Sequence, residues 1–379
     1  MGHVQRRGKS WRARYIGPDG KERSRSFPRK VDAQRFLSTA ETDKARGEWI
    51  DPRLGRRTFA EWCQEFEGSR VHLEETTKAQ HGALIRTHVM PAFGDRPLAS
   101  ITEMQVQSFV SDLLAKGLAP STVSKVLGIL SQILKAATRN QLIARNPCEG
   151  VVGPGEKPQE ERIFLTPEQL GALADEIGAQ FRPMVLVAGY RGLRFGELAG
   201  LRPRRLNLLL GKLEVAEALK ESRGRLYFGL PKHDRVRTVS LPPFLVDILR
   251  DHIEAFPPQG DLVFTSQDGA FLRRSNFERR IWAPAVLRAG IDERLTFHGL
   301  RHTAVSILIA EGASIVELAA VMGWAPSTAV AMAMRYGHLF AARDEHLTQA
   351  LERVYRSAGR PNDGQSAIPM KKRSTESGA

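Results

Sequence analysis

Two arginines in the sequence stand one helical turn from a second group that could act with them. Arg194 precedes Glu197 by three residues, and Arg301 follows His298 by three. Residues at this spacing share one face of a helix, so each pair would project in the same direction. Arginine grips phosphate through a fork of N–H groups, and histidine moves protons near neutral pH. These residue types suit a reaction at a phosphodiester, in which charge on a non-bridging oxygen is neutralised and a leaving oxygen is protonated.

Each of these residues also has a simpler interpretation. Arg194 could be a surface arginine in a helix turn, and Glu197 could cap a helix. His298 could be a core histidine whose hydrogen bonds are satisfied within the protein. The spacing alone leaves both interpretations open.

A reaction at phosphate also needs a nucleophile, and tyrosine is one candidate. Its phenol has a pKa of roughly 10, so it reacts as a phenolate only in a strongly cationic site. Two arginines supply that charge and can replace the metal ion of carboxylate-dependent nucleases, and the sequence shows no persuasive carboxylate cluster for magnesium. The five tyrosines are Tyr15, Tyr190, Tyr227, Tyr336 and Tyr355.

Composition indicates a basic globular protein. The chain has 379 residues, 56 of them Lys or Arg and 42 Asp or Glu, and its net charge is +14. This length predicts two or three domains, and 42% hydrophobic residues excludes a wholly disordered or fibrous chain. The excess positive charge favours a polyanionic partner, nucleic acid above all, with a merely soluble basic protein as the alternative.

The sequence also bears on the compartment. Cys63 and Cys148 are far apart and lack metal-ligand spacing, which excludes a disulfide scaffold and a cysteine-rich zinc site. Residues 1–30 are polar and basic, so we expect no signal peptide. No uncharged apolar run reaches the roughly 18 residues that a membrane span needs. We therefore expect a soluble cytoplasmic protein that makes no contact with a membrane.

The N-terminal segment concentrates the charge. Ten Lys or Arg stand in residues 1–30 against two acidic residues. Trp11, Ala13 and Tyr15 alternate with arginines before a Gly17–Gly20 turn, which predicts a β-hairpin. One face would pack on the helix that follows, and the other would present cations to DNA phosphates or remain a solvated charged face. The predicted DNA-binding residues are Arg12, Arg14, Lys21, Arg23 and Arg25.

Helical periodicity begins at Thr58, a suitable N-cap, and places an apolar stripe on one face of a helix expected at 121–139. A Pro/Gly/charge-rich stretch after Asn146 interrupts this periodicity. From Phe164 helices return, followed by strand-like runs at 212–216, 225–229 and 236–240 and then by further helices. We predict a multidomain chain. Its parts are a small N-terminal β-sheet plus helix (1–56), an all-α domain (57–145), a linker (146–162), a mostly α domain with a small antiparallel β-sheet (163–356) and a disordered tail (357–379).

Several motifs of the last domain follow one another in a specific order. They are Gly192–Leu198, Pro231–Lys232, Arg237–Pro242, His298–Thr303, Met322–Trp324 and Arg335–His338. In this order and spacing they resemble the tyrosine recombinases, the phage-integrase family, over about residues 57–356. The N-terminal hairpin is similar to the arm-site-binding domain that many integrases carry.

The resemblance implies a role for each site residue. Arg194 and Arg301 would clamp the scissile phosphate, with Glu197 orienting a neighbour and His298 transferring a proton or donating a hydrogen bond. Lys232 would protonate the leaving 5′-oxygen, with Lys220 as its rival.

Two further positions depart from the family pattern or have rivals. Trp324 stands where most of the family has histidine, so it could bind phosphate through its N–H or only pack in the core. Tyr336 would be the nucleophile, with Tyr355 as the fallback. The twelve residues from Trp324 to Tyr336 exceed the family's usual gap by two or three, and the extra Ala329–Met334 stretch could lengthen the loop or helix that delivers Tyr336.

The implied function is site-specific recombination of double-stranded DNA at core and arm sites through a 3′-phosphotyrosine, for a phage or other mobile element. It would need no metal, cofactor or ATP. Four protomers would act together, with accessory DNA-bending or directionality factors as further partners, and a C-terminal amphipathic helix that includes Leu351 and Val354 would dock on its own domain or on a neighbour. The alternatives are a type IB topoisomerase-like enzyme, a catalytically decayed DNA-binding protein and a metal-dependent transposase or nuclease.

Overall fold

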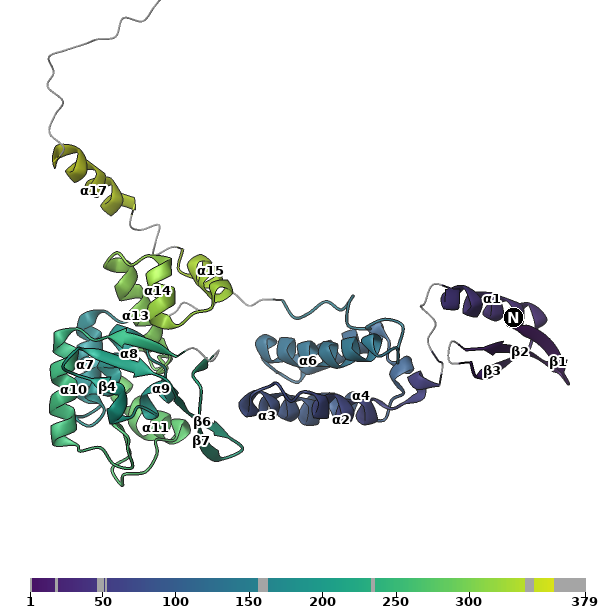
Figure 1. The fold of residues 1–379 in the computed structure, drawn as a ribbon, viewed down its shortest axis with the longest axis horizontal. Coiled ribbons are helices and arrows are strands. Elements are labelled where there is room, and N and C mark those ends of the chain that lie inside the picture. Colours follow the sequence, from purple (N-terminus) through teal and green to yellow (C-terminus); the bar gives the residue numbers. More distant parts are fainter. Residues whose placement is uncertain are drawn as a thin grey trace, which may run out of the picture. The chain divides into compact units, whose positions relative to one another are not determined.

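A computed structural model of the chain describes residues 2–17, 20–45, 51, 53–155, 163–232, 236–337 and 344–357. The chain forms two compact units, Met1–Glu160 and Glu161–Ala379 (Figure 1). The boundary between them falls inside the predicted linker 146–162, and the finer division at the other predicted boundaries stays a prediction. The predicted tail 357–379 lies, apart from its first residue, outside the described residues.

The N-terminal part is a three-stranded antiparallel sheet covered on one face by a helix. Ala13 and Tyr15 are buried against that helix, where the Tyr15 ring meets Phe36 at 5.7 Å between centroids. Sequence alternation predicted the hairpin, and the structure adds a further strand before it. The elements are β1 (His3–Arg7), β2 (Ser10–Ile16), β3 (Glu22–Phe27) and α1 (Lys30–Ala45), with strand order β1-β2-β3.

The register of this sheet corrects one expectation. Arg12 pairs with Ser26 and therefore lies on the open face, away from Ala13 and Tyr15. Arg25 pairs with Ala13, and Arg23 with Tyr15, so both arginines of β3 lie on the face that carries α1. A strand exposes alternate residues, and the turn between β2 and β3 sets which set is exposed. The hairpin therefore does not gather all its arginines on one side.

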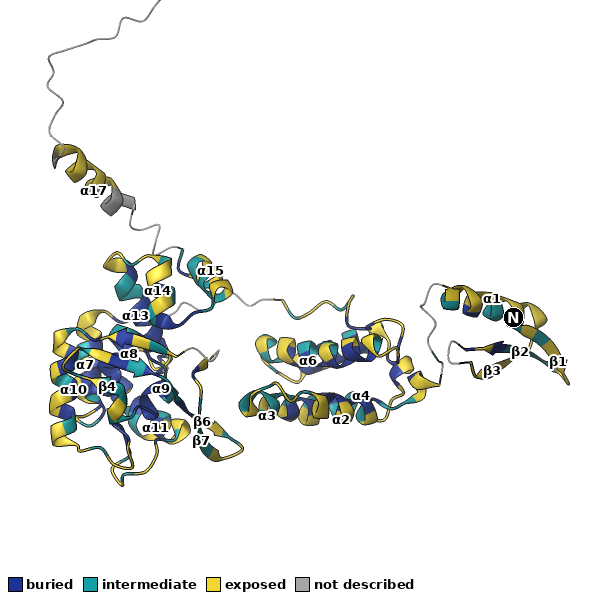
Figure 2. Ribbon diagram, in the orientation of Figure 1, coloured by how far each residue is buried: buried dark blue, intermediate teal, exposed yellow. Residues whose placement is uncertain are grey.

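A helical bundle follows in the same unit. Thr58 and Thr102 each cap a helix, and the indole N–H of Trp62 donates to the Ile133 carbonyl at 3.0 Å across the core. The bundle buries the apolar stripe that the sequence predicted on its long last helix (Figure 2). Its elements are η1 (Leu54–Arg56), α2 (Phe59–Ser69), α3 (Glu75–Leu84), η2 (Ile85–Val89), α4 (Met90–Phe93), η3 (Leu98–Ser100), α5 (Glu103–Ala115) and α6 (Pro120–Arg139).

The second unit is mostly helical. Its first half comprises α7 (Pro167–Glu176), α8 (Arg182–Arg191), α9 (Phe195–Ala199), η4 (Pro203–Arg205), β4 (Leu206–Asn207), β5 (Lys212–Val215), β6 (Ala218–Ser222), β7 (Arg225–Gly229) and β8 (Arg237–Ser240). The strands form two small antiparallel sheets, β4-β5-β8 and β6-β7. The second half comprises α10 (Pro243–Ala255), α11 (Arg274–Phe277), η6 (Glu278–Trp282), α12 (Ala283–Arg288), α13 (Gly299–Ala310), α14 (Ile315–Met322), α15 (Pro326–Arg335) and α17 (Asp344–Ser357). The predicted fold class is confirmed.

Helix α8 is the centre of this unit. Its residues Pro183 to Gly189 are all buried, so it is covered on every side, and α7, α10 and α13 contact it. In contrast, α17 leaves Leu351, Val354 and Tyr355 exposed. None of the helices in the described part of the chain is long and apolar enough to cross a membrane.

Gly192, directly after α8, tests whether the end of this helix requires a glycine. It adopts a left-handed conformation at φ +69°, and a Cβ there would lie 2.4 Å from the Met322 sulfur. We expect Gly192→Ala to lower the free energy of unfolding by at least about 2 kcal/mol, because both the backbone and the contact become strained.

Chemical denaturation followed by circular dichroism measures this change. Gly171→Ala is the matched control, since Gly171 lies inside α7 with open space around it and should gain up to about 1 kcal/mol of stability. Equal effects of the two substitutions would contradict the prediction.

Candidate active site

The turn between α8 and α9 presents Arg194 beside Glu197. The Arg194 backbone N–H donates to Glu197 Oε2 at 3.0 Å, and the Arg194 guanidinium donates to Oε1 at 2.8 Å. The Glu197 side chain is 1% exposed, whereas the Arg194 side chain is 22% exposed. Glu197 therefore acts both as a cap of α9 and as an orienting group, the two roles that the sequence left open, and the edge of Arg194 faces solvent.

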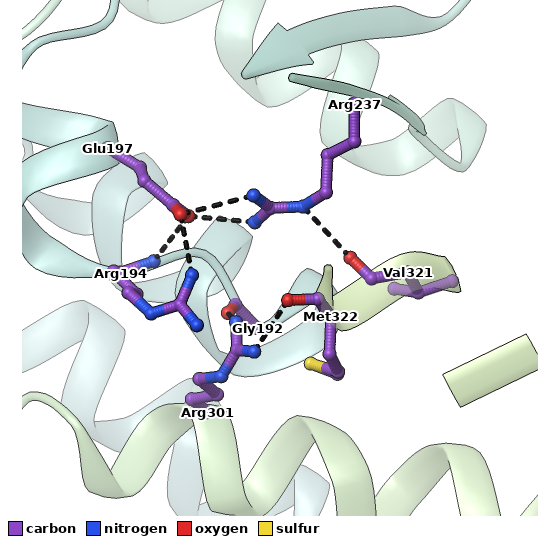
Figure 3. Close-up of polar contacts among 7 residues, drawn as sticks. All are labelled: Gly192, Arg194, Glu197, Arg237, Arg301, Val321 and Met322. Atoms are coloured by element: carbon purple, nitrogen blue, oxygen red, sulfur yellow. Dashed lines mark hydrogen bonds and ion pairs between the residues drawn. The ribbon is translucent and has the colours of Figure 1, made fainter. Parts of the chain in front are cut away.

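Arg301 is buried on α13 and binds backbone rather than acid. It donates through Nη1 to the Gly192 carbonyl at 2.6 Å and through Nη2 to the Met322 carbonyl at 2.6 Å (Figure 3). These bonds join the end of α8 to the end of α14. Burial and then the charge of Arg194 lower the pKa of Arg301 to about 9, so the group remains charged at neutral pH.

A third arginine, Arg237 on β8, meets the same carboxylate, and the sequence did not predict it as a site residue. Its Nη1 and Nη2 donate to Glu197 at 3.1 and 2.8 Å. Burial alone would raise the pKa of Glu197, but the contacts with Arg237 and then Arg194 lower it to about 2. Two guanidiniums thus share one carboxylate, and with Arg301 the cluster has three cations and one acid, an excess of positive charge that suits an anion.

His298 borders this cluster at the start of α13. The pKa of His298 is lowered to about 4 by partial removal of water and then by Arg301, Arg194, Arg274 and Lys232. The imidazole is therefore neutral near pH 7 in the DNA-free protein. The charges of all four cations lower the pKa of His298, so these cations lie near the imidazole. They come from the turn before α9, from α11, from α13 and from the β7–β8 connection.

Lys232 is exposed and follows the buried Pro231 after β7. Its rival Lys220 lies on β6 opposite Tyr227. Because the charge of Lys232 acts on His298, the ammonium lies near the arginine cluster. Residues 233–235, which follow Lys232, lie outside the described residues.

Tyr336 ends α15 and is 1% exposed. Its hydroxyl makes a hydrogen bond with Nδ1 of His302, which stands one turn after His298 on α13; the two histidine rings are 5.2 Å apart. Tyr336 also raises the pKa of Arg301, so it lies within electrostatic reach of the cluster. The sequence motif that contains His302 gave it no role.

Trp324 and the segment after it complete the site. Trp324 is 6% exposed and packs in one small core with Met322 and Tyr336. The Ala/Met-rich stretch before Tyr336 forms α15, so the longer spacing builds a helix. Tyr355, the alternative nucleophile, is 62% exposed on α17, and His338 lies outside the described residues.

Three known families match successive parts of the chain, from residue 2 to residue 343. Residues 159–343 match the phage integrase family, residues 56–154 the phage integrase central domain, and residues 2–46 the phage integrase N-terminal domain. The chain belongs to the phage integrase family of tyrosine recombinases. It is a tyrosine-type site-specific recombinase, an integrase.

Relatives of this integrase span nearly its full length. The prophage phiRv2 integrase of Mycobacterium tuberculosis is 27% identical over 363 residues, which cover 91% of this chain and 92% of the relative. Among solved structures, the Tn1549 transposon integrase with a circular-intermediate DNA has a TM-score of 0.66 at 19% identity, covering 74% of this chain and 94% of that one. A lambda integrase tetramer bound to a Holliday junction has a TM-score of 0.54 at 16% identity, covering 85% and 95%. Both structures share the fold.

In the N-terminal sheet of this integrase, the five predicted DNA-binding residues have different surroundings. Arg12 and Arg14 lie on the open face, where Arg14 pairs with Glu22 at 2.7 Å, and Lys21 is exposed at the start of β3. On the other face, Arg23 is 8% exposed and forms an ion pair with Asp51. Arg25 is exposed, and its guanidinium stacks over Phe27 and Phe36, both at 5.3 Å.

The lowered pKa of His298 predicts how the free energy of unfolding depends on pH. Because the folded state holds the pKa near 4 and the unfolded state has the ordinary value, the unfolded state binds more protons below about pH 6.5. The free energy of unfolding should therefore fall as pH drops from about 6.5 toward 4, and His298→Gln should make that dependence shallower.

Urea denaturation at a series of pH values measures the slope, and the imidazole signals in an NMR titration report the pKa directly. An imidazole at position 298 that titrates near 6.5 in the wild-type protein would contradict the prediction. His252→Gln is not a suitable control, because burial also lowers the pKa of His252. His3→Gln is the matched control for the pH dependence of the free energy of unfolding, because His3 is exposed and belongs to the other compact unit.

Proposed function

We propose that Arg194 and Arg301 bind the scissile phosphate of double-stranded DNA, and that Tyr336 attacks it. The observation that carries this proposal is the cationic cluster itself. Arg194 and Arg237 both bind the buried carboxylate of Glu197, and Arg301 is held nearby by the Gly192 and Met322 carbonyls, with Tyr336 within electrostatic reach. A phosphate would supply the missing negative charge, and the arginines would neutralise its non-bridging oxygens.

The chemical step conserves the phosphate ester. The Tyr336 oxygen forms a bond to phosphorus while the bond to the 5′-oxygen breaks, which leaves a 3′-phosphotyrosine and a free 5′-hydroxyl. Lys232 supplies the proton that the leaving 5′-oxygen takes, and the neutral imidazole of His298 accepts the proton of the phenol. Attack by the 5′-hydroxyl of a partner strand reverses the step. The arginines carry the charge stabilisation, so the proposal requires neither a metal, a cofactor nor ATP.

In this proposal, the Tyr336 hydroxyl leaves His302 and moves to the phosphate when DNA binds. Tyr336 is buried against His302, whereas a phosphate must approach through the exposed edge of Arg194. None of the ten residues of α15 is buried. Moving α15 itself would therefore expose little additional apolar surface, and the cost of delivery lies mainly in the buried ring of Tyr336 and its hydrogen bond to His302.

The nucleophile is tested by trapping the covalent intermediate in EDTA without ATP. Wild-type protein is mixed with DNA carrying the element's own attachment region, quenched with detergent and analysed for a DNA-linked peptide by mass spectrometry. We expect the adduct on Tyr336, no adduct with Tyr336→Phe, and DNA affinity of that variant within about twofold of wild type, since phenylalanine keeps the buried ring.

Tyr355→Phe is the matched control and should retain the adduct, because Tyr355 is exposed on α17. An adduct with Tyr336→Phe would transfer the role to Tyr355. Loss of the wild-type adduct in EDTA would favour metal-dependent chemistry, relaxation without strand exchange would favour a topoisomerase-like activity, and binding without any adduct would favour a decayed DNA-binding protein.

The open face of the N-terminal sheet is proposed to bind arm-type DNA. Arg12 and Arg14 support this assignment by their register on the open face, and Lys21 is exposed in the turn between β2 and β3. Arg23 is buried and paired with Asp51, so we leave it out of the proposed contacts. Removal of one cation that binds a phosphate should reduce the slope of log affinity against log salt by about 0.9. We expect the double variant Arg12→Ala, Arg14→Ala to have a slope shallower by about two on DNA that carries arm sites.

Fluorescence anisotropy at several salt concentrations gives that slope. Arg25→Ala is the control, because Arg25 is exposed on the same sheet but on the face that carries α1. A double variant with the wild-type slope would remove this face from the DNA interface.

The larger assembly is proposed on the same basis. The helical domain (57–145) and the catalytic domain (163–356) would hold core DNA, and four protomers would exchange strands between two duplexes. The tetramer of the lambda integrase on a Holliday junction supports this arrangement by likeness of fold. The reaction would serve a phage or other mobile element and act on DNA in the bacterial cytoplasm, with accessory DNA-bending or directionality factors.

A further inference from the structure

Arg237 is a buried cation at the first position of β8. It pairs in register with Val215 of β5, and two residues on, Val239 pairs with Leu213. These three apolar neighbours are at most 2% exposed, and the Arg237 side chain is 8% exposed. Strand alternation thus turns an arginine toward the interior, where an unpaired cation would be costly.

The first partner of Arg237 is the carboxylate that also holds Arg194. Arg237 binds Glu197 through both terminal nitrogens, one to each oxygen (Figure 3). Arg194 binds the same two oxygens through its backbone N–H and its guanidinium. Because a forked pair fixes the plane of a carboxylate, Arg237 sets the orientation of the oxygens to which Arg194 is attached.

The second partner is the end of α14. Arg237 Nε donates to the Val321 carbonyl at 3.2 Å, and Arg301 takes the next carbonyl, that of Met322. The last carbonyls of a helix lack partners within the helix, so the two arginines cap α14 together. The chain then turns through left-handed Gly323, where a Cβ would lie 3.1 Å from the Arg237 Cδ, and continues to Trp324.

These contacts close a ring. Arg194 is joined through Glu197 to Arg237, Arg237 through the Val321–Met322 segment to Arg301, and Arg301 through the Gly192 carbonyl back to the turn that carries Arg194. Arg237 is the member of this ring that comes from the sheet. Three of its N–H groups, one on each nitrogen, are bonded to other members of this ring.

We propose that Arg237 is a positioning residue for recombination, which fixes Arg194, Arg301 and the turn to Trp324 in the geometry that binds the scissile phosphate. This role rests on the proposed function of Arg194 and Arg301. Loss of Arg237 should therefore lower the rate of cleavage rather than the affinity for DNA. Misplacement of a charged group by about 1 Å can lower a rate about 100-fold.

The test separates cleavage from binding. Full-length protein is mixed with a nicked suicide duplex that carries the element's own core site, and the single-turnover rate of covalent adduct formation is measured beside the dissociation constant, its salt dependence and the melting temperature. The variants are Arg237→Leu and Arg237→Lys. The matched control is Arg202→Leu, since the Arg202 guanidinium also forms ion pairs with acidic side chains, those of Glu217 and Asp261, but makes no contact of the ring.

We expect Arg237→Leu to slow adduct formation by about 100-fold while the dissociation constant and salt slope stay within about twofold of wild type. Arg237→Lys should form the adduct about tenfold faster than Arg237→Leu. The lysine ammonium can pair with Glu197, but it cannot make the forked contact with Glu197 and the bond to the Val321 carbonyl at the same time. If Arg237 acts through Glu197, the double variant with Glu197→Gln should be no slower than the slower single variant. Should Arg237→Leu fail to fold, Arg237→Lys and its double variant with Glu197→Gln carry the same comparison.

Three results would overturn the role. A weaker dissociation constant with a salt slope reduced by about one and an unchanged rate would make Arg237 a phosphate ligand. A lower melting temperature with wild-type cleavage below that temperature would make it purely structural. Multiplicative effects of Arg237→Leu and Glu197→Gln would mean that the two act independently. Failure of the proposed function looks different, because wild-type protein itself would then form no adduct, and the role would fall with it.

Discussion

The carboxylate of Glu197 is the interaction on which the catalytic unit depends. It is buried, and it is shared between a guanidinium from a helix turn and a guanidinium from a strand. Buried cations repel one another and lose the solvation of water, so they remain close only where a compensating charge is fixed between them. Without Glu197, the guanidiniums of Arg194 and Arg237 would have no shared acid to compensate their charges.

The compensation is incomplete, and this has a functional consequence. Arg301 donates its hydrogen bonds to two backbone carbonyls, which offer dipoles rather than charge. The cluster is therefore assembled before substrate arrives, with its cations already directed and its excess charge unmet. A site prepared in this way stabilises developing negative charge without first reorganising, which is the larger part of electrostatic catalysis.

The sequence predicted what depends on short spacing. The pairing of Arg194 with Glu197, the fold class and the apolar stripe of α6 follow from periodicities of two to four residues, and the structure contains all three. Contacts between distant segments were not predictable from spacing: Arg237 meets Glu197 across 40 residues, and His302 meets Tyr336 across 34. The register of the N-terminal sheet was not predictable for a related reason. The alternation on each strand is visible in sequence, but which residues of two strands share a face depends on the geometry of the turn between them.

The arginines and the tyrosine of the proposed site differ in how the protein holds them. The arginines are fixed by hydrogen bonds to Glu197 and to helix ends, whereas the tyrosine is attached to α15, a helix without a single buried residue. The hydroxyl nevertheless has a definite resting place on His302, one helical turn from His298 and so on the same helix as Arg301. In the proposed reaction, a cation site fixed by hydrogen bonds and a tyrosine carried by a partly exposed helix would separate recognition of phosphate from the step that cuts it. Because the Ala329–Met334 stretch lies within α15, the additional residues between Trp324 and Tyr336 are accommodated in the helix that carries the tyrosine, while the residues that carry the charge stand on other elements.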